Sequence, residues 1–282
     1  MPGTPLTIAI VGAGLGGLTA ASTLRRYGFD VQVYEQASGF ARIGAGIQMM
    51  PNSMKVLRRI GIEERVRATS FEPYSHLNRQ WDTGEVMREL PMPESLFGAP
   101  YLCMHRGVIY YTRRDKSEIY FVTSVPESAE WLTRESWSAT GDVRELRKAY
   151  EGFHPDVRAV LESCPDCHKW AILEREPLAK WRDGRVVLLG DACHPMTPYM
   201  AQGAATAMED AAVLARCLAD AEGDVRSAFA RYEAHRKPRT SRIQAISSAN
   251  TWMRGGNDDT SWLYGYDAWN VPLNEPALNP TS

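Results

Sequence analysis

A glycine-rich turn between two predicted strands constrains the fold of this chain more than any other stretch. The β-branched run Thr7–Val11 leads into Gly12-Ala13-Gly14-Leu15-Gly16-Gly17, and an Ala/Leu-rich segment continues to Tyr27. A second strand pattern covers residues 30–35 and ends on the carboxylate of Glu35. This order of strand, G-x-G-x-x-G turn, helix, strand and acid predicts a βαβ unit of a Rossmann-like α/β domain.

The same turn predicts a dinucleotide site. Gly12 permits the tight turn, Gly14 lets backbone approach a pyrophosphate, and Gly17 lets the helix pack close to the strand. Glu35, about 20 residues further on, can accept hydrogen bonds from an adenosine ribose. The acid disfavours a 2′-phosphate, so FAD or NAD is favoured over NADP. A glycine-rich turn without function is the alternative, which the complete βαβ pattern disfavours.

Composition excludes several classes of partner. Hydrophobic residues make up 44% of the 282 residues, charged residues 23%, and the formal net charge is −2. This balance gives no reason to expect nucleic acid or an anionic membrane as a partner. The sequence has no run of 18 apolar residues and no basic, apolar leader at its start, and its five cysteines lack regular spacing. We therefore expect a cytoplasmic location.

A second glycine-rich loop covers residues 42–48 and precedes a predicted helix at about residues 53–60. Glycines on both sides of Ala45 allow backbone to lie against a flat or phosphorylated ligand. A loop whose glycines serve only its backbone conformation, without binding a ligand, explains the pattern equally well. Within the first interpretation, Arg42 and Gly46 are candidate cofactor contacts.

The middle of the chain has strand-like patterns. Residues 71–90 predict two strands around the turn Asp82-Thr83-Gly84, and residues 108–112 and 119–125 predict a further pair. Arg106 precedes this second pair and could reach a phosphate, although an isolated arginine at a strand end is usually a solvated charge. These strands predict a mixed sheet facing a substrate.

The motif Cys164-Pro165-Asp166-Cys167-His168 matches the C-x-x-C-H pattern of haem attachment, and C-x-x-C also occurs in zinc and redox sites. Covalent haem attachment requires export, and zinc requires a second pair of suitably spaced ligands. We therefore predict a loop before a strand at Trp170, and no metal site.

The stretch from Arg185 to Ala212 carries the second group of candidate residues. Val186–Leu189 is a continuous apolar run, which predicts a strand buried on both faces. Asp191 follows at the carboxyl end of that strand, where open α/β sheets bind ligands, and its carboxylate can accept hydrogen bonds from a ribityl or ribose chain.

A proline-containing loop then leads to Gly203 and to a predicted helix over residues 204–219. The partial positive charge of a helix start could stabilise negative charge on a ring system such as a reduced flavin. Gly203 and Ala204 are therefore candidate contacts of the ring.

Taken together, the motifs GAGLGG, GAGIQMMPN, GDACHPMTPYMAQGA and MEDA resemble those of the group A flavoprotein aromatic monooxygenases, the family of p-hydroxybenzoate and salicylate hydroxylases. The segments YFVTSVPE, YEGFHP, ANTW and WLYGYD resemble the 6-hydroxynicotinate branch of that family. The resemblance implies the GR2-type flavoprotein hydroxylase fold, with an FAD-binding domain and an interwoven mixed-sheet substrate domain.

The resemblance also implies an activity. FAD would be the cofactor, NADH or NADPH the transient reductant and dioxygen the oxidant, with transfer of OH through a flavin C4a-hydroperoxide. The substrate would be a hydroxylated aromatic or N-heteroaromatic carboxylate of the 6-hydroxynicotinate type, with or without decarboxylation, and a salicylate-type substrate is the alternative. A homodimer is compatible with this interpretation.

Site residues follow from the resemblance at matching positions. The cofactor-binding residues are expected to be Gly12, Gly14, Gly17, Glu35, Arg42, Gly46, Arg106, Asp191, Gly203 and Ala204. Gln48 and Tyr199 stand where the 6-hydroxynicotinate enzymes place histidine and are the candidate catalytic residues. Both can hydrogen-bond a substrate, but neither is a good base near neutral pH.

The chain departs from the family at one place. The second flavin motif, Gly-Ala-Asp-Gly before a basic helix, has no counterpart, because His105-Arg106-Gly107 passes directly to the 108–112 strand pattern. Roughly a hundred residues are missing after residue 107, which predicts an incomplete nucleotide domain. A remnant that binds nucleotide without catalysis is therefore an alternative of another class.

The expected domains are discontinuous. Residues 1–70, 98–107 and 174–250 form the expected FAD-binding domain, residues 71–97 and 108–173 the substrate-domain sheet, and residues 251–282 a C-terminal tail.

Overall fold

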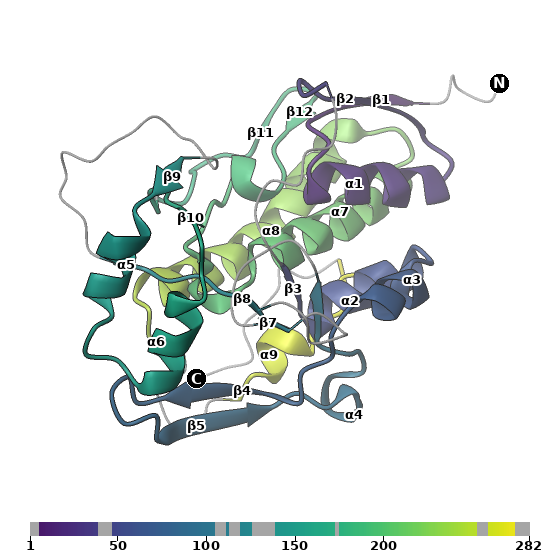
Figure 1. The fold of residues 1–282 in the computed structure, drawn as a ribbon. Coiled ribbons are helices and arrows are strands. Elements are labelled where there is room, and N and C mark those ends of the chain that lie inside the picture. Colours follow the sequence, from purple (N-terminus) through teal and green to yellow (C-terminus); the bar gives the residue numbers. More distant parts are fainter. Residues whose placement is uncertain are drawn as a thin grey trace.

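The computed structural model describes residues 6–38, 47–104, 111–112, 119–125, 139–172, 175–252 and 259–273. Two long helices, α7 (Gly203–Ala219) and α8 (Val225–Ser248), run through the middle of the molecule, and the other elements surround them (Figure 1).

The predicted βαβ unit is confirmed. Strand β1 (Thr7–Val11) pairs in parallel with β2 (Asp30–Tyr34), and α1 (Leu15–Arg26) connects them. The connecting turn requires a glycine at its first position, because Gly12 has φ of +102°. The fold is therefore α/β, and its first unit is of the Rossmann type.

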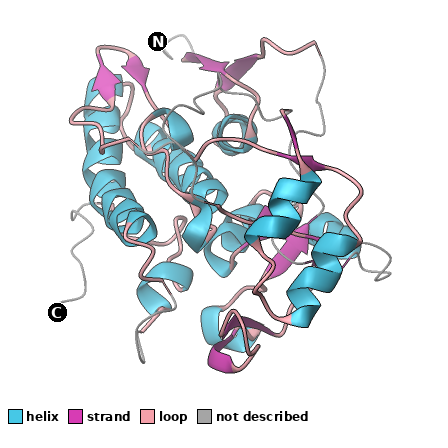
Figure 2. Cartoon of the chain, turned by 60° about the vertical axis from the view of Figure 1, so that its left-hand side comes forward, coloured by secondary structure: helices cyan, strands magenta, loops and turns pink. Residues whose placement is uncertain are grey.

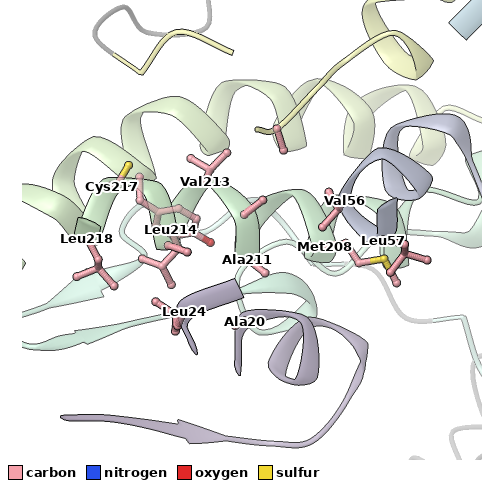
Figure 3. Close-up of a cluster of buried hydrophobic side chains, with 14 of the residues drawn as sticks. Ala20, Leu24, Val56, Leu57, Met208, Ala211, Val213, Leu214, Cys217 and Leu218 are labelled. Carbon is pink, nitrogen blue, oxygen red and sulfur yellow. The ribbon is translucent and has the colours of Figure 1, made fainter. Parts of the chain in front are cut away.

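The core lies between α1 and α7. Small side chains on both helices, such as Ala20 and Ala211, let the two backbones come close, and the Thr23 hydroxyl donates a hydrogen bond to the Ala211 carbonyl across the interface (3.2 Å). Leu24 packs at this contact, whereas Val213 points from the opposite side of α7 towards α8 (Figure 3). The close approach fixes the glycine-rich turn against the start of α7.

Two antiparallel strand pairs flank this core. Strand β3 (Ile47–Met49) pairs with β6 (Leu102–Met104), and β4 (Ser75–Arg79) pairs with β5 (Val86–Pro91). The helices between these strands are α2 (Pro51–Arg59), α3 (Glu63–Thr69) and α4 (Glu94–Phe97). The 71–90 hairpin and the helix after the second glycine-rich loop are thus confirmed.

Smaller pairs complete the described part. Strand β7 (Tyr111–Thr112) pairs with β8 (Ile119–Tyr120), which confirms the predicted pair, but residues 121–125 of the second predicted strand are in no strand. Strand β9 (Thr140–Gly141) pairs with β10 (Cys167–His168). The prediction of a loop before a strand at Trp170 is therefore wrong, because the strand lies within the predicted loop and Trp170 is in no strand. Helices α5 (Val143–Ala149), α6 (Pro155–Glu162) and α9 (Ser261–Tyr264) lie beside these pairs and the core.

The prediction of a strand buried on both faces at residues 186–189 is wrong. Only Val186–Val187 forms a strand, β12, and it pairs with β11 (Arg182–Asp183) as a hairpin. Val186 is 65% exposed. Every sheet within the described residues has two strands, so β11 is the one strand that pairs with β12, and Figure 2 shows the strands as short pairs among the helices. Among these same residues, no helix has the length and apolar character needed to cross a membrane.

Candidate cofactor site

The turn after β1 has open space where a phosphate group would lie. A Cβ atom built on Gly12 or Gly14 meets no heavy atom within 4 Å. Gly14 is the N-cap of α1, whose first turn has neither a side-chain cap hydrogen bond nor an acidic residue. Backbone N–H groups at such a helix start favour anions. The turn therefore fits a pyrophosphate.

The predicted Glu35 carboxylate lies against this turn. Its Oε2 accepts the Ala13 amide (2.8 Å) and its Oε1 accepts the Ala37 amide (2.9 Å). These backbone hydrogen bonds, the Ala13 bond foremost, lower the pKa of Glu35 below its usual range. A carboxylate has about four acceptor positions, so two remain for the hydroxyls of a ribose.

The second candidate segment lies at the start of α7. Asp191 belongs to a 3₁₀ turn, η1 (Gly190–Ala192), and its residue is exposed to solvent. A Cβ built on Gly203 would lie 3.9 Å from Asp191 Oδ1, so the carboxylate and the first residue of α7 are neighbours. Crowding of the carboxylate by surrounding protein raises the pKa of Asp191, and Asp210 adds to that effect. Ala204 follows Gly203 in the first turn of α7.

The structure brings the two segments together on one side chain of α7. A Cβ on Gly16 would lie 3.2 Å from Ala207 Cβ and 2.6 Å from Leu189 Cδ2, and a Cβ on Gly190 would lie 3.0 Å from the same Ala207 atom. Gly190, with its φ of +63°, therefore requires glycine, whereas a side chain at Gly16 would displace the flexible end of Leu189 and press against Ala207. The glycine-rich turn and the Asp191 turn therefore both lie against Ala207 of α7.

A buried charge network lies beneath the second segment. Glu209 pairs with Arg239 (2.8 Å) and Arg236 (2.7 Å), and Asp210 pairs with Arg236 (2.6 Å) and His194 (2.5 Å). Burial alone would raise the pKa of Asp210, but His194 and Arg236 outweigh it and hold the pKa at about 2. Both carboxylates are therefore ionised near neutral pH.

Cys193, His194 and Asp210 form a buried group whose potential metal-ligand atoms all lie within 4.8 Å of one another. Their other contacts do not suit a metal ion. Asp210 already accepts hydrogen bonds from Arg236 and from the Gly190 amide, and burial raises the pKa of the Cys193 thiol far above its usual range. A thiol must lose its proton to bind a metal, so the group is better explained as structural.

The two candidate catalytic residues have different surroundings. Gln48 on β3 is buried, and its Oε1 accepts a hydrogen bond from the Tyr101 hydroxyl (3.0 Å). Tyr199 lies in a second 3₁₀ turn, η2 (Pro198–Met200), and is 36% exposed. Asn52 links their two segments, because its amide donates to the Gln202 side chain (3.0 Å) just before α7. Their catalytic role stays a prediction.

Three predicted cofactor contacts, Arg42, Gly46 and Arg106, lie outside the described residues. Two hollows in the described part contain none of the predicted site residues. One is lined by Leu6, Phe29, Leu218 and their neighbours, and the other lies between α5 and α6. Within the described residues, the candidate site is thus formed by two turns beside α7.

Sequence reasoning did not single out Gly16, Ala207 or Asp210. The signal for Gly16 was present, since it is one of the four glycines of the turn. Asp210 belongs to the MEDA motif, but its role depends on partners 16 and 26 residues away. Ala207 has no sequence signal, because an alanine on a helix is unremarkable until its neighbours are known.

Comparison with known proteins shows the family to which the chain belongs. A family model described as FAD binding domain matches residues 5–128 and 96–247. The chain is 35% identical to a 6-hydroxynicotinate 3-monooxygenase of Pseudomonas fluorescens, covering 96% of this chain and 97% of the relative. It is 34% identical to the enzyme of the same name from Bordetella bronchiseptica, covering 98% of both.

A solved structure of a salicylate hydroxylase with its substrate superposes with a TM-score of 0.72. It covers 94% of this chain and 96% of the other at 17% sequence identity. So low an identity establishes a shared fold alone.

The alignments also bear on the missing segment. The Pseudomonas alignment runs over 378 positions, whereas this chain has 282 residues, so a long part of the relative has no counterpart here. The two matches to the family model overlap between residues 96 and 128. A break in that region, as predicted after residue 107, explains why the model matches in two sections.

Proposed function

Because the chain belongs to the FAD-binding family of aromatic-ring monooxygenases, we propose that it hydroxylates a small hydroxylated aromatic or N-heteroaromatic carboxylate. The proposed substrate is of the 6-hydroxynicotinate type, with or without decarboxylation. NADH or NADPH is the proposed reductant and dioxygen the proposed oxidant. A salicylate-type substrate is the alternative within the same chemistry.

One observation supports this proposal above the others. The Gly12–Gly17 turn and the Asp191 turn both pack on Ala207, one through Gly16 and the other through Gly190. Either turn alone is compatible with many nucleotide proteins. Their meeting on one helix supports the proposal that one FAD uses both, its phosphates at the first turn and its hydroxyls at the second.

Each part of the site has a separate task in binding. The α1 start would hold the pyrophosphate, Glu35 the ribose hydroxyls and Asp191 the ribityl hydroxyls. The positive end of α7 at Gly203 would favour negative charge on the ring. When bound, FAD supplies the redox chemistry with NAD(P)H and dioxygen that side chains cannot supply.

The candidate catalytic residues would act by hydrogen bonding. Gln48 and Tyr199 offer an amide and a phenol to the polar groups of the substrate, and neither is a base at neutral pH. The proposal therefore assigns them orientation of the substrate. The phenolic proton of the substrate would have to leave to solvent or to another group.

The test starts with the colour of the protein. Purified chain is incubated with FAD, freed of unbound cofactor and scanned for flavin absorbance. NADH consumption is then measured with 6-hydroxynicotinate and with salicylate side by side, and hydroxylated product is quantified. The proposal predicts yellow protein and product in proportion to NADH with one of the two. Protein that stays colourless contradicts it.

A non-catalytic remnant is the second candidate. The missing alignment positions and the two-stranded sheets favour it, because a Rossmann domain normally has a wider sheet. Such a remnant would bind FAD without consuming NADH. A leaky site would instead consume NADH and release peroxide without hydroxylated product, since water would enter an open site.

The proposal includes a cytoplasmic location, the discontinuous domains given above and a homodimer. All five cysteines are free thiols in the structure. Sedimentation at several protein concentrations tests the dimer.

A further inference from the structure

Asp191 lies between two residues, Gly190 and His194, that both hydrogen-bond the buried carboxylate of Asp210. On one side, the Gly190 amide donates to Asp210 Oδ2 (3.1 Å). On the other side, His194 Nε2 lies 2.5 Å from the same oxygen and must carry the hydrogen, because Asp210 is ionised. The residues at both ends of the Asp191 turn are therefore tied to one atom.

That carboxylate is itself held firmly. Arg236 of α8 donates from Nε to Asp210 Oδ1 (2.6 Å) and from Nη2 to the Thr206 carbonyl (3.3 Å). His194, Asp210 and Arg236 are each 0% exposed. Charged hydrogen bonds between fully buried groups are short and strong, so the anchor does not depend on solvent.

The backbone of the turn leaves little freedom. Gly190 has φ of +63°, and a Cβ there would lie 3.0 Å from Ala207, one helical turn before Asp210. Gly203, the first residue of the same helix, is the neighbour of the Asp191 carboxylate. The α7 helix therefore contacts the Asp191 turn at three positions along its length, which are Gly203, Ala207 and Asp210.

We propose that Asp210 is a positioning residue for the cofactor, which acts through the Gly190 amide and His194 to hold Asp191 ready for the FAD ribityl chain. This inference rests on the proposed function, since it requires that Asp191 faces FAD. Asp210 does not itself touch the cofactor in this arrangement.

Glu209 provides a matched control. It precedes Asp210, is equally buried, and pairs with Arg239, Arg236 and Asn52. No hydrogen bond connects it to the Gly190–His194 turn within the described residues. Loss of its charge should therefore lower stability without moving Asp191.

The test is a double-mutant cycle on FAD affinity, measured by titration of flavin fluorescence. Asp210→Asn should weaken FAD binding about tenfold or more, because the amide has one accepting oxygen, which cannot serve Arg236 on one side as well as Gly190 and His194 on the other. In an Asp191→Ala background the same change should have less than about a twofold effect. Equal effects in both backgrounds would show a general structural role and overturn the proposal. Glu209→Gln should leave FAD affinity within about twofold of the wild type.

Two further measurements keep the outcome clear. If Asp210→Asn does not fold, His194→Gln runs the same cycle, because it removes one anchor and keeps the Arg236 pair. Amide hydrogen exchange of the FAD-free protein gives a readout that needs no cofactor. Exchange at residues 190–194 should rise in either variant while exchange in α8 stays constant. Unchanged exchange at residues 190–194 in the variants contradicts the anchoring role of Asp210, whether or not the wild type binds FAD. Failure of the wild type to bind FAD would count against the proposed function alone.

Discussion

At the scale of single residues, His76 on β4 is a histidine in a largely apolar setting. Its ring stacks on Tyr101 with centroids 4.6 Å apart, and its Nε2 is buried without a hydrogen-bond partner. Burial lowers the pKa of His76 to about 4, from an ordinary value of 6.5. His76 therefore becomes protonated at a lower pH in the folded chain than in the unfolded chain.

This difference predicts a loss of stability in mild acid. The contribution of neutral His76 is complete above pH 6.5 and is lost as the pH falls from there towards 4. Near pH 5 the loss should be about 2 kcal/mol of unfolding free energy. His76→Phe keeps a ring for stacking and should remove this part of the decline, as measured by denaturant unfolding at both pH values.

The exposed His168 offers a control for that experiment. His168→Gln should leave the decline of the wild type intact. A His76→Phe protein that loses stability with acid as steeply as the wild type would show that another group is responsible.

At the scale of elements, two glycines of the turn between β1 and α1 have different roles: Gly17 is needed for packing, and Gly14 leaves room for a ligand. A Cβ on Gly17 would lie 2.1 Å from the Gly12 carbonyl oxygen, and backbone cannot move aside cheaply. A Cβ on Gly14 meets nothing within 4 Å, and the backbone there, with φ of −70°, suits any residue. The two glycines therefore serve different purposes.

Two alanine variants should separate these purposes. Gly17→Ala should lower the unfolding free energy by about 1 to 3 kcal/mol, as overpacked sites do. Gly14→Ala should change it by less than about 0.5 kcal/mol, yet weaken FAD binding because the methyl group occupies the phosphate space. Chemical denaturation and FAD titration of both variants provide the check, with Gly152→Ala as a tolerated control whose Cβ has ordinary 3.5 Å contacts. Equal FAD affinity of Gly14→Ala and wild type would contradict the assigned phosphate position.

At the scale of the whole molecule, the core is helical and the sheet is narrow. The α7 helix is buried from Ala205 to Ala215, whereas Val11 on β1 is 90% exposed and Val186 on β12 is 65% exposed. Strands with the apolar composition of a sheet interior thus lie at the surface.

Because Val186 on β12 is exposed, we expect a polar substitution there to have little effect on stability. Val186→Thr should change the unfolding free energy by less than about 0.5 kcal/mol. Leu24→Ala, at a position that is 1% exposed, should cost about 2 to 5 kcal/mol. Both are measured by denaturant unfolding under the same conditions. A cost above about 2 kcal/mol for Val186→Thr would mean that β12 is buried in solution, as its sequence alone suggested.

Local patterns determined much of this protein. The strand, turn, helix and strand of the first unit follow from β-branched runs, glycine spacing and a terminal acid, all within residues 7–35. The helix after Gly203 and the hairpin around Gly84 were predictable for the same reason, because the relevant interactions lie close together in the chain. Glu35 at the glycine-rich turn belongs to this class, since β1 and β2 carry it there.

Tertiary structure decided the rest. An apolar run such as Val186–Leu189 favours burial only if neighbouring strands are present to cover it, and the run itself does not reveal their absence. The two candidate cofactor segments both contact Ala207, and Asp210 hydrogen-bonds both ends of the Asp191 turn. These contacts join segments that lie far apart in sequence. Such contacts are set by how helices pack, which no local pattern encodes.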